Sequence, residues 1–437
     1  MTRPGGTWRN WARTEKIRPQ SVERPRTVEA VRRAVDAARR RGLRVKAVGA
    51  GHSFTGIALA PGVLLDLTDL TGLVSVDPET RSVRLLAGTR LHQIPGLLRP
   101  YGLAMENLGD IDHQSIAGAL ATGTHGTGAR FGGLATQVIG LTLVTASGDL
   151  VTISESENAE LLPAGALSLG ALGIVVDVTL RCVPAFGLAA QEKPERLTEV
   201  VDGFAERAVA SDHFEFFWFP HTDLALTKTN RRLDVGESLR PLSRAARLTD
   251  DLVISGLVHP MACGVGTVVP ALVPAINRMS SRVWGNRSFS DQSTRVFTSV
   301  RHVRFREMEY ALPVAQLPEA FHAVQCLIEE RRWRIEFPIE VRVAAADDVW
   351  MSTAYGRDTG YLAIHRYWRK RPDEYFRAVE EIMRSFGGRP HWGKMHSADA
   401  QTLRELYPRF DEFLAVRERL DPDRAFRNAY LDRVLGP

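Results

Sequence analysis

The sequence predicts an α+β protein built from two lobes. The chain has 437 residues, which is too long for one compact core and suits two substantial domains. Before Pro184, one amphipathic helix is followed by many short strand-like runs and glycine-rich turns. After Pro184, strands alternate with helices. This pattern predicts a mixed α+β domain over residues 1–184 and an antiparallel sheet flanked by helices over residues 185–399.

The first domain opens with a helix and continues in short strands. Residues 27–41 place Val31, Val35 and Ala38 on one helical stripe, and Gly42 ends the helix. Apolar runs then predict strands over residues 43–48, 63–67, 83–87, 138–145 and 150–153. This order is not the regular βαβ wind of a Rossmann fold.

The second domain alternates strands with helices. Strands are expected over residues 213–219, 303–310, 339–343 and 360–367. Helices are expected over residues 318–331, 373–386 and 400–420. We expect residues 400–437 to form a separate C-terminal helical segment.

Composition is that of an ordinary globular protein. Hydrophobic residues make up 44% and charged residues 24%, with a net charge of +5. The arginine runs lie beside apolar residues at helical spacing, and no nucleic-acid-binding module is present, so we expect no nucleic-acid partner. Cys182, Cys263 and Cys326 form neither a metal pattern nor a disulfide framework, and the first residues lack the apolar stretch of an export signal. We therefore expect a cytoplasmic protein without a metal site.

One uncharged stretch leaves the membrane question open. Residues 252–276 contain no Asp, Glu, Lys or Arg and are long enough to span a bilayer. The stretch also contains Pro260, Pro270 and Pro274, which would interrupt a spanning helix. A transmembrane span, a surface that faces a membrane, and a buried or pocket-covering segment are the three interpretations.

Three glycine-rich elements of the first domain are candidates for a ligand cradle. Val48-Gly49-Ala50-Gly51-His52-Ser53-Phe54 follows a predicted strand, and glycines there let backbone N–H groups approach a phosphate closely. It fails as a Rossmann fingerprint, because Phe54 occupies the third glycine position. Residues 115–128 and 168–175 are the other two elements. Each alone could be a tight turn without a ligand, but three in one domain indicate a surface wrapped around an extended dinucleotide.

These elements give a specific resemblance when they are combined with His391-Trp392-Gly393-Lys394. From Trp11 to its end the chain resembles the aldonolactone oxidoreductases, which include L-gulono-1,4-lactone and D-arabinono-1,4-lactone oxidases and dehydrogenases and the related alditol oxidases. The resemblance implies a vanillyl-alcohol-oxidase-like (PCMH-type) FAD-binding domain and a substrate domain with an antiparallel sheet. It also implies that the flavin lies between them, near the segment 400–437.

The cofactor implied by the resemblance is FAD, bonded covalently through His52. An imidazole can act as the nucleophile, and a turn beside the flavin would fix its direction. The alternative is a histidine that only hydrogen-bonds within the loop. The implied cofactor-binding residues are Ala47, Val48, Gly49, Ala50, Gly51, His52, Ser53, Asp110, Ser115, Gly118, Ala119, Ala121, Thr122, Gly123, Thr124, His125, Val175 and His391.

Candidate catalytic residues come from the second domain. Strand periodicity places Glu340 and Arg342 on one face and Ile339, Val341 and Val343 on the other. By themselves they could be a surface ion pair. The resemblance implies instead that Glu340 binds the sugar hydroxyls and that Arg342 stabilises negative charge on the substrate oxygen or the reduced flavin.

Lys394 is one of only six lysines in the chain. The resemblance implies that its ammonium lies near the flavin and favours the reduced, anionic form. The alternative is an ordinary surface lysine.

Two positions depart from the alditol oxidases. His365 stands where they have a threonine, and Asp110 stands where they have a substrate-binding serine. Both changes favour a lactone or another cyclic sugar. His365 could be the base that takes the hydroxyl proton, or a core histidine bonded to a neighbour. Substrate-binding candidates are thus Asp110, Glu340, Arg342, His365 and Lys394.

The sequence therefore predicts an FAD-dependent oxidoreductase that oxidises a secondary alcohol of an aldono-1,4-lactone and passes electrons to oxygen or another acceptor. One alternative is an alditol or sugar-derivative oxidase, with a polyol as substrate. Another is a flavin-holding, membrane-associated scaffold without turnover, suggested by the uncharged stretch.

Overall fold

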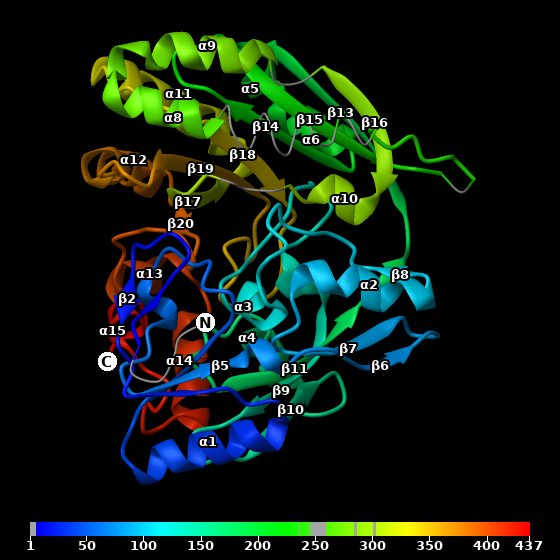
Figure 1. Ribbon diagram of the computed structural model, residues 1–437, viewed down its shortest axis with the longest axis vertical. Helices are drawn as coiled ribbons and strands as arrows, with labels where there is room; N and C mark the ends of the chain where they lie inside the picture. Colours follow the sequence, from blue (N-terminus) through cyan, green and yellow to red (C-terminus); the bar gives the residue numbers. More distant parts are fainter. Residues whose placement is uncertain (1–5, 235, 244–245, 247–258, 284–285, 300–302) are drawn as a thin grey trace.

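The computed structural model describes residues 6–234, 236–243, 246, 259–283, 286–299 and 303–437, which form two stacked lobes (Figure 1). The lower lobe of Figure 1 holds the N-terminal elements together with the C-terminal helices. The upper lobe holds one large sheet with helices on its outer side. The chain thus leaves the lower lobe, builds the upper lobe and returns.

The lower lobe contains two sheets. A three-stranded parallel sheet has the order β3 (Ser21–Glu23), β5 (Val63–Asp66) and β4 (Val45–Val48). A five-stranded antiparallel sheet has the order β10 (Leu150–Ser154), β9 (Val138–Val144), β11 (Ile174–Arg181), β7 (Ser82–Leu86) and β6 (Leu73–Asp77). Two further strand pairs are β1 (Trp8–Arg9) with β2 (Lys16–Ile17), and β8 (Leu103–Ala104) with β12 (Val183–Pro184). Short helices α2 (Ile94–Leu98), α3 (Ile116–Ala121) and α4 (Leu162–Gly165) connect them.

Helix α1 (Val28–Arg40) confirms the first predicted helix. Thr27 caps its start, where the side-chain oxygen accepts a hydrogen bond from the Ala30 amide at 3.1 Å. The stripe of Val31, Val35 and Ala38 is buried against both sheets, as its spacing predicts.

The upper lobe is built on an eight-stranded antiparallel sheet. Its order is β16 (Arg287–Gln292), β13 (Gly187–Arg196), β15 (Leu224–Arg232), β14 (His213–Trp218), β18 (Ile339–Ala344), β19 (Thr359–Tyr367), β17 (Phe305–Pro313) and β20 (Arg389–Pro390). Helices α5 (Leu197–Asp202), α6 (Phe204–Ala210), α11 (Leu317–Glu330) and α12 (Asp373–Ser385) pack with the sheet's apolar residues into one core. The short helix α10 (Ser293–Phe297) follows β16. The opposite face of the sheet is turned toward the lower lobe.

The C-terminal segment corrects one prediction. The helix expected over residues 400–420 is two helices, α13 (Ala400–Leu406) and α14 (Phe410–Leu420), followed by α15 (Ala429–Leu435). The break falls at Pro408, because proline has no amide proton and holds the preceding Tyr407 in extended backbone. Leu403, Phe413 and Leu431 from these helices join the core of the lower lobe.

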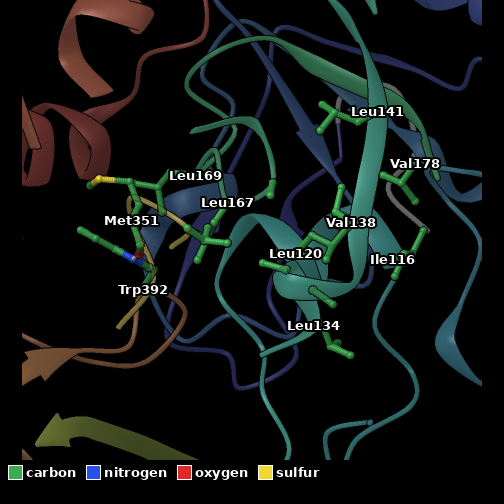
Figure 2. Close-up of a cluster of buried hydrophobic side chains, with 14 of the residues drawn as sticks. Ile116, Leu120, Leu134, Val138, Leu141, Leu167, Leu169, Val178, Met351 and Trp392 are labelled. Atoms are coloured by element: carbon green, nitrogen blue, oxygen red, sulfur yellow. Dashed lines mark hydrogen bonds between the residues drawn. The ribbon is translucent and has the colours of Figure 1, made fainter. Parts of the chain in front are cut away.

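Figure 2 shows how that core reaches the junction of the lobes. Leu120, Val138 and Leu141 of the lower lobe pack into it, and Trp392 and Met351 lie at one end. The Trp392 indole N–H donates a hydrogen bond of 2.7 Å to the Met351 carbonyl, so this end of the core is fixed by a polar contact as well as by packing.

The uncharged stretch lies partly outside the described residues, since 252–258 are not among them. The part that follows forms α8 (His259–Val268), a short 3-10 turn at Pro270–Leu272, and α9 (Val273–Val283). Within the described part of the chain, no helix is long and apolar enough to cross a membrane. Met261, Val265, Val268, Val269, Leu272 and Met279 are instead exposed on the surface.

Candidate active site

Two adjoining hollows run from the lower lobe to the junction with the upper sheet. The smaller one, about 560 Å³, is lined only by residues of the lower lobe. The larger one, about 740 Å³ with its open mouth, is lined by residues of both lobes. His52, Ser53, Gln114 and Thr122 line both, so the two hollows form one elongated site.

The smaller hollow is walled by the three glycine-rich elements. Strand β4 runs into the turn at Gly49–Ser53, α3 supplies Ser115 and Gly118, and the loop at Leu169 and Gly170 closes the wall. A Cβ at Gly49 would overlap the Ser115 hydroxyl, and Gly51 has φ +69°, a conformation that side chains disfavour. Glycine is therefore required here by a close approach and by a left-handed turn. The space left beside bare backbone fits an elongated dinucleotide such as FAD.

The predicted cofactor residues divide between the hollows. Lining the smaller one are Ala47, Val48, Gly49, Ala50, Gly51, His52, Ser53, Ser115, Gly118, Ala121 and Thr122. Lining the larger one are also Asp110, Thr124, His125 and His391. Ala119 packs in the core, Gly123 forms a turn at φ +77°, and Val175 lines a separate small hollow. These last three lie outside the lining of the elongated site.

His52 lies where the two hollows meet. Its ring stacks on Trp11, with centroids 5.7 Å apart. Burial lowers the pKa of His52 to about 4, and the nearby His113, Arg90 and Lys394 act in the same direction. The imidazole is therefore neutral at ordinary pH, and a neutral imidazole has the free lone pair that a nucleophile needs.

Glu340 and Arg342 belong to a buried charge cluster. Both face the larger hollow from β18, while Ile339, Val341 and Val343 pack in the helix-covered core, which confirms the predicted faces. Arg342 forms an ion pair with Glu340, and its Nε donates a hydrogen bond of 2.8 Å to Glu215. Burial opposes the charge on Glu215, but Arg342 and Lys228 outweigh it and lower the pKa of Glu215. Two carboxylates therefore balance two cations in this wall.

Lys394 forms a second buried pair. Its ammonium contacts the Glu307 carboxylate and lies 5.5 Å from the centre of the Phe54 ring. Burial alone would raise the pKa of Glu307, but Lys394 and then His365 lower it to about 2. Lys394 is thus oriented into the hollow by a carboxylate from β17.

A hydrogen bond from the Nδ1 atom of His365 to the backbone fixes the orientation of this ring. Nδ1 lies 3.0 Å from the Pro338 carbonyl and must be the donor there, since that oxygen can only accept. Nε2 lies 3.6 Å from the Glu307 carboxylate. The ring is therefore oriented with one nitrogen on the backbone and the other facing a carboxylate in the hollow.

His125 and His391 flank a third carboxylate, Glu309. His125 Nε2 lies 2.9 Å from Glu309 and its ring stacks on Tyr361 with centroids 3.6 Å apart. The Gly393 amide donates to His391 Nδ1 at 3.0 Å. Because burial lowers the pKa of His391 to about 4, its proton resides on Nε2. One donor atom each from His125, Glu309 and His391 lies within 4.8 Å of the others, as do those of His92, Asp112 and His113 at the surface, so both groups have the composition of a metal-binding set.

Several lining residues were not predicted from the sequence. Glu307 and Glu309 alternate on β17 with Met308 and Tyr310, which pack in the core. That period of two is a readable signal for a strand with one polar face. Glu215 is not itself a lining residue but pairs with Arg342, and it likewise alternates with the buried Phe214 and Phe216 on β14. Predicted Asp110 lies at the rim, where it accepts a hydrogen bond of 2.7 Å from Ser299.

The turn at His52 and the element at His391 are bound to each other directly. The Phe54 amide donates a hydrogen bond of 2.7 Å to the Gly393 carbonyl. Gly128 likewise donates to Val343 of β18 at 2.8 Å. These contacts bring the cradle and the charged face of the sheet together around one hollow.

Comparison with known proteins identifies the family. Residues 178–434 match the model of D-arabinono-1,4-lactone oxidase, and residues 19–154 match that of an FAD binding domain. The chain is 43% identical to L-gulono-1,4-lactone dehydrogenase of Mycobacterium tuberculosis, over 98% of this chain and 99% of that one. It is 35% identical to L-gulonolactone oxidase of Bos taurus and 32% identical to alditol oxidase of a Streptomyces species, each over 98% of both chains.

Among solved structures, cholesterol oxidase from B. sterolicum superposes with a TM-score of 0.85 over 99% of this chain and 96% of that one, at 20% identity. This likeness confirms the fold, with its FAD-binding domain of the PCMH type and its antiparallel sheet. The family matches cover both lobes and meet at the elongated site. The chain therefore belongs to the aldonolactone oxidoreductases, a family of FAD-dependent oxidoreductases that act on CH–OH donors.

Proposed function

We propose that this protein oxidises a secondary alcohol of an aldono-1,4-lactone, of the L-gulono or D-arabinono type. The observation that carries the proposal is that the charged face of β17, β18 and β19 and the glycine-rich cradle line one continuous site. The relatives named above support the substrate class. FAD bound in this site would supply the acceptor for the hydride that leaves the alcohol carbon.

Each charged residue has a role in this reaction. Glu340 accepts hydrogen bonds from the sugar hydroxyls, and Asp110 binds the substrate from the rim. Arg342 and Lys394 stabilise negative charge as it develops. Both cations are already paired with carboxylates, so they act through oriented N–H donors rather than through excess positive charge. His365 takes the hydroxyl proton on Nε2, beside Glu307. His391, which lines the larger hollow, would help to hold FAD there.

Covalent attachment of FAD to His52 is part of the proposal. The neutral, half-buried imidazole at the meeting point of the two hollows supports it. Mass spectrometry of the denatured protein should give the chain mass plus one flavin, and His52→Ala should give the chain mass alone. A wild-type chain without added mass would contradict the attachment.

Anaerobic stopped-flow mixing tests the substrate class. L-Gulono-1,4-lactone or D-arabinono-1,4-lactone should bleach the flavin faster than xylitol, and Lys394→Met should slow the bleaching while the exposed control Lys16→Met should not. Faster reduction by xylitol would favour the alditol oxidase alternative. A flavin that no sugar reduces would favour a protein without turnover. Repeating the reaction with oxygen or a dye then identifies oxygen or another molecule as the electron acceptor.

A surface contact with membranes and a cytoplasmic location complete the proposal. The exposed apolar residues of α8 and α9 lie in a stretch, 252–290, that contains Arg278, Arg282 and Arg287 but no Asp or Glu. Apolar side chains with cations beside them fit an anionic lipid surface. Vesicles with phosphatidylglycerol should sediment the protein and those of phosphatidylcholine should not, and Val268→Asp should abolish binding. If the protein sediments equally with both kinds of vesicle, or with neither, the membrane contact is contradicted. The exposed apolar residues of α8 and α9 would then be assigned to a contact with a protein partner.

A further inference from the structure

Lys46 is a buried cation in the wall of the smaller hollow. It lies within β4, only 3% exposed, three residues before the glycine turn begins at Gly49. Val45 and Ala47 face the core beneath α1, so the strand's alternation turns Lys46 and Val48 the other way. Lysine is among the residues least often fully buried, and a buried one needs a partner.

The described residues do not supply enough partners. An ammonium has three N–H donors, and Lys46 uses one of them on the Gly170 carbonyl at 2.9 Å. Within the described part of the chain no carboxylate lies close enough to form an ion pair with it. Asp421 is the acidic group that acts on it from the C-terminal segment, but its two oxygens accept from the amides of Ala425 and Phe426 at 2.6 and 3.1 Å.

The environment of Lys46 lowers the pKa of its ammonium group. Burial and, to a smaller extent, Arg417 lower the pKa of Lys46 to about 7 against the opposing effect of Asp421. The protein alone therefore holds this lysine only partly charged near neutral pH. An anion placed against it would favour the charged form and restore the missing hydrogen bonds.

The occupant is specified by the rest of the wall. Lys46 lines the same hollow as Gly49, Gly51, Ser115 and Gly170, where bare backbone allows close approach. We infer that Lys46 binds the diphosphate of FAD, taking up one proton to do so, and that it is the cofactor's buried counter-ion. This inference rests on FAD binding, which the family establishes, and it assigns a residue outside the glycine motif.

Reversible binding is needed to test this assignment, so the experiment uses the full-length His52→Ala protein. FAD affinity is measured by fluorescence between pH 6 and 9, with ADP-ribose and adenosine as competitors. ADP-ribose carries the diphosphate and does not titrate in this range, whereas adenosine is uncharged. Lys46→Met should weaken the binding of FAD and of ADP-ribose by about tenfold or more, since a charge-assisted hydrogen bond to the diphosphate is lost. It should weaken the binding of adenosine by less than about twofold.

The pH profile provides a second readout. With Lys46 present, FAD affinity should fall as the pH rises above 7, because the lysine must first take up a proton. Lys46→Arg should keep the affinity and lose the slope, since arginine stays charged. Lys16→Met is the exposed control. Equal weakening of ADP-ribose and adenosine, or one pH slope in all variants, would overturn the inference. Failure of every variant to bind FAD would instead challenge the cofactor itself.

Discussion

Replacing Gly49 by alanine tests how closely the glycine turn must approach helix α3. The backbone at Gly49 is not left-handed, so the substitution introduces no torsional strain. An added Cβ would, however, overlap the Ser115 hydroxyl and lie 3.1 Å from the Ser115 Cβ. Ser115 caps α3, where its hydroxyl accepts from the Gly118 amide at 3.3 Å.

The expected cost follows from these contacts. Ser115 must turn away, which removes the cap and costs about 1 kcal/mol. The remaining contact between the two Cβ atoms forces the backbones apart, which costs about 1–3 kcal/mol. Gly49→Ala should therefore lower the free energy of unfolding by about 2–4 kcal/mol and weaken FAD binding, because the wall of the smaller hollow moves.

A second substitution separates this clash from other effects. Ser115→Gly removes the obstructing side chain, and glycine at a helix cap costs only a few tenths of a kcal/mol. In urea unfolding, the double variant Gly49→Ala/Ser115→Gly should regain most of the free energy of unfolding that Gly49→Ala loses. Gly96→Ala is the control, since nothing lies within 4 Å of its Cβ position. If the double variant is as unstable as Gly49→Ala, the close approach is not the cause and the reasoning fails.

Three further substitutions test other parts of the site. Because the pKa of Glu307 is lowered from 4.5 to about 2, its charge contributes stability above pH 4.5 that is lost as the pH falls toward 2. The wild type should lose about 3 kcal/mol more than Glu307→Gln across that window in acid titrations of unfolding, and parallel curves would contradict this. The side-chain amide of Asn428 donates to the carbonyls of Gly56, Ile57 and Leu59, and a carboxylate there would repel these oxygens. Asn428→Asp should therefore lower the melting temperature of the protein more than Asn428→Ala does. The reverse order in thermal melts would rule this out. Trp392→Phe should cost about 2–3 kcal/mol in urea unfolding, since it opens a cavity and leaves the Met351 carbonyl unpaired; a change below about 0.5 kcal/mol would refute that account.

The sequence was most informative where side-chain period and glycine geometry act locally. The stripe of α1 and the two faces of β18 follow from spacing, and the structure confirms both. The three glycine-rich elements are far apart in the chain, yet each is recognisable because bare backbone is needed at a close approach.

Other features depend on tertiary context that no local pattern contains. Strands β13 and β15 were not predicted. In β13, polar residues such as Gln191, Glu192 and Lys193 give a pattern that is typical of a loop. They are strands because each pairs along its length with the other. The pairing of Lys394 with Glu307 was likewise unpredictable from spacing, since it joins the last strand region to β17.

The return of the chain to the lower lobe has a consequence for synthesis. The Val45 amide at the start of β4 donates a hydrogen bond of 2.9 Å to the Ala425 carbonyl, and Asn428 holds the 3-10 turn at Gly56–Ala58 that follows the glycine turn. Nearly the whole polypeptide must therefore leave the ribosome before the flavin cradle can close. Chains that stop before this segment would keep the glycine motifs but lack this closure, so we expect flavin capture to require that residues 425–428 have been made.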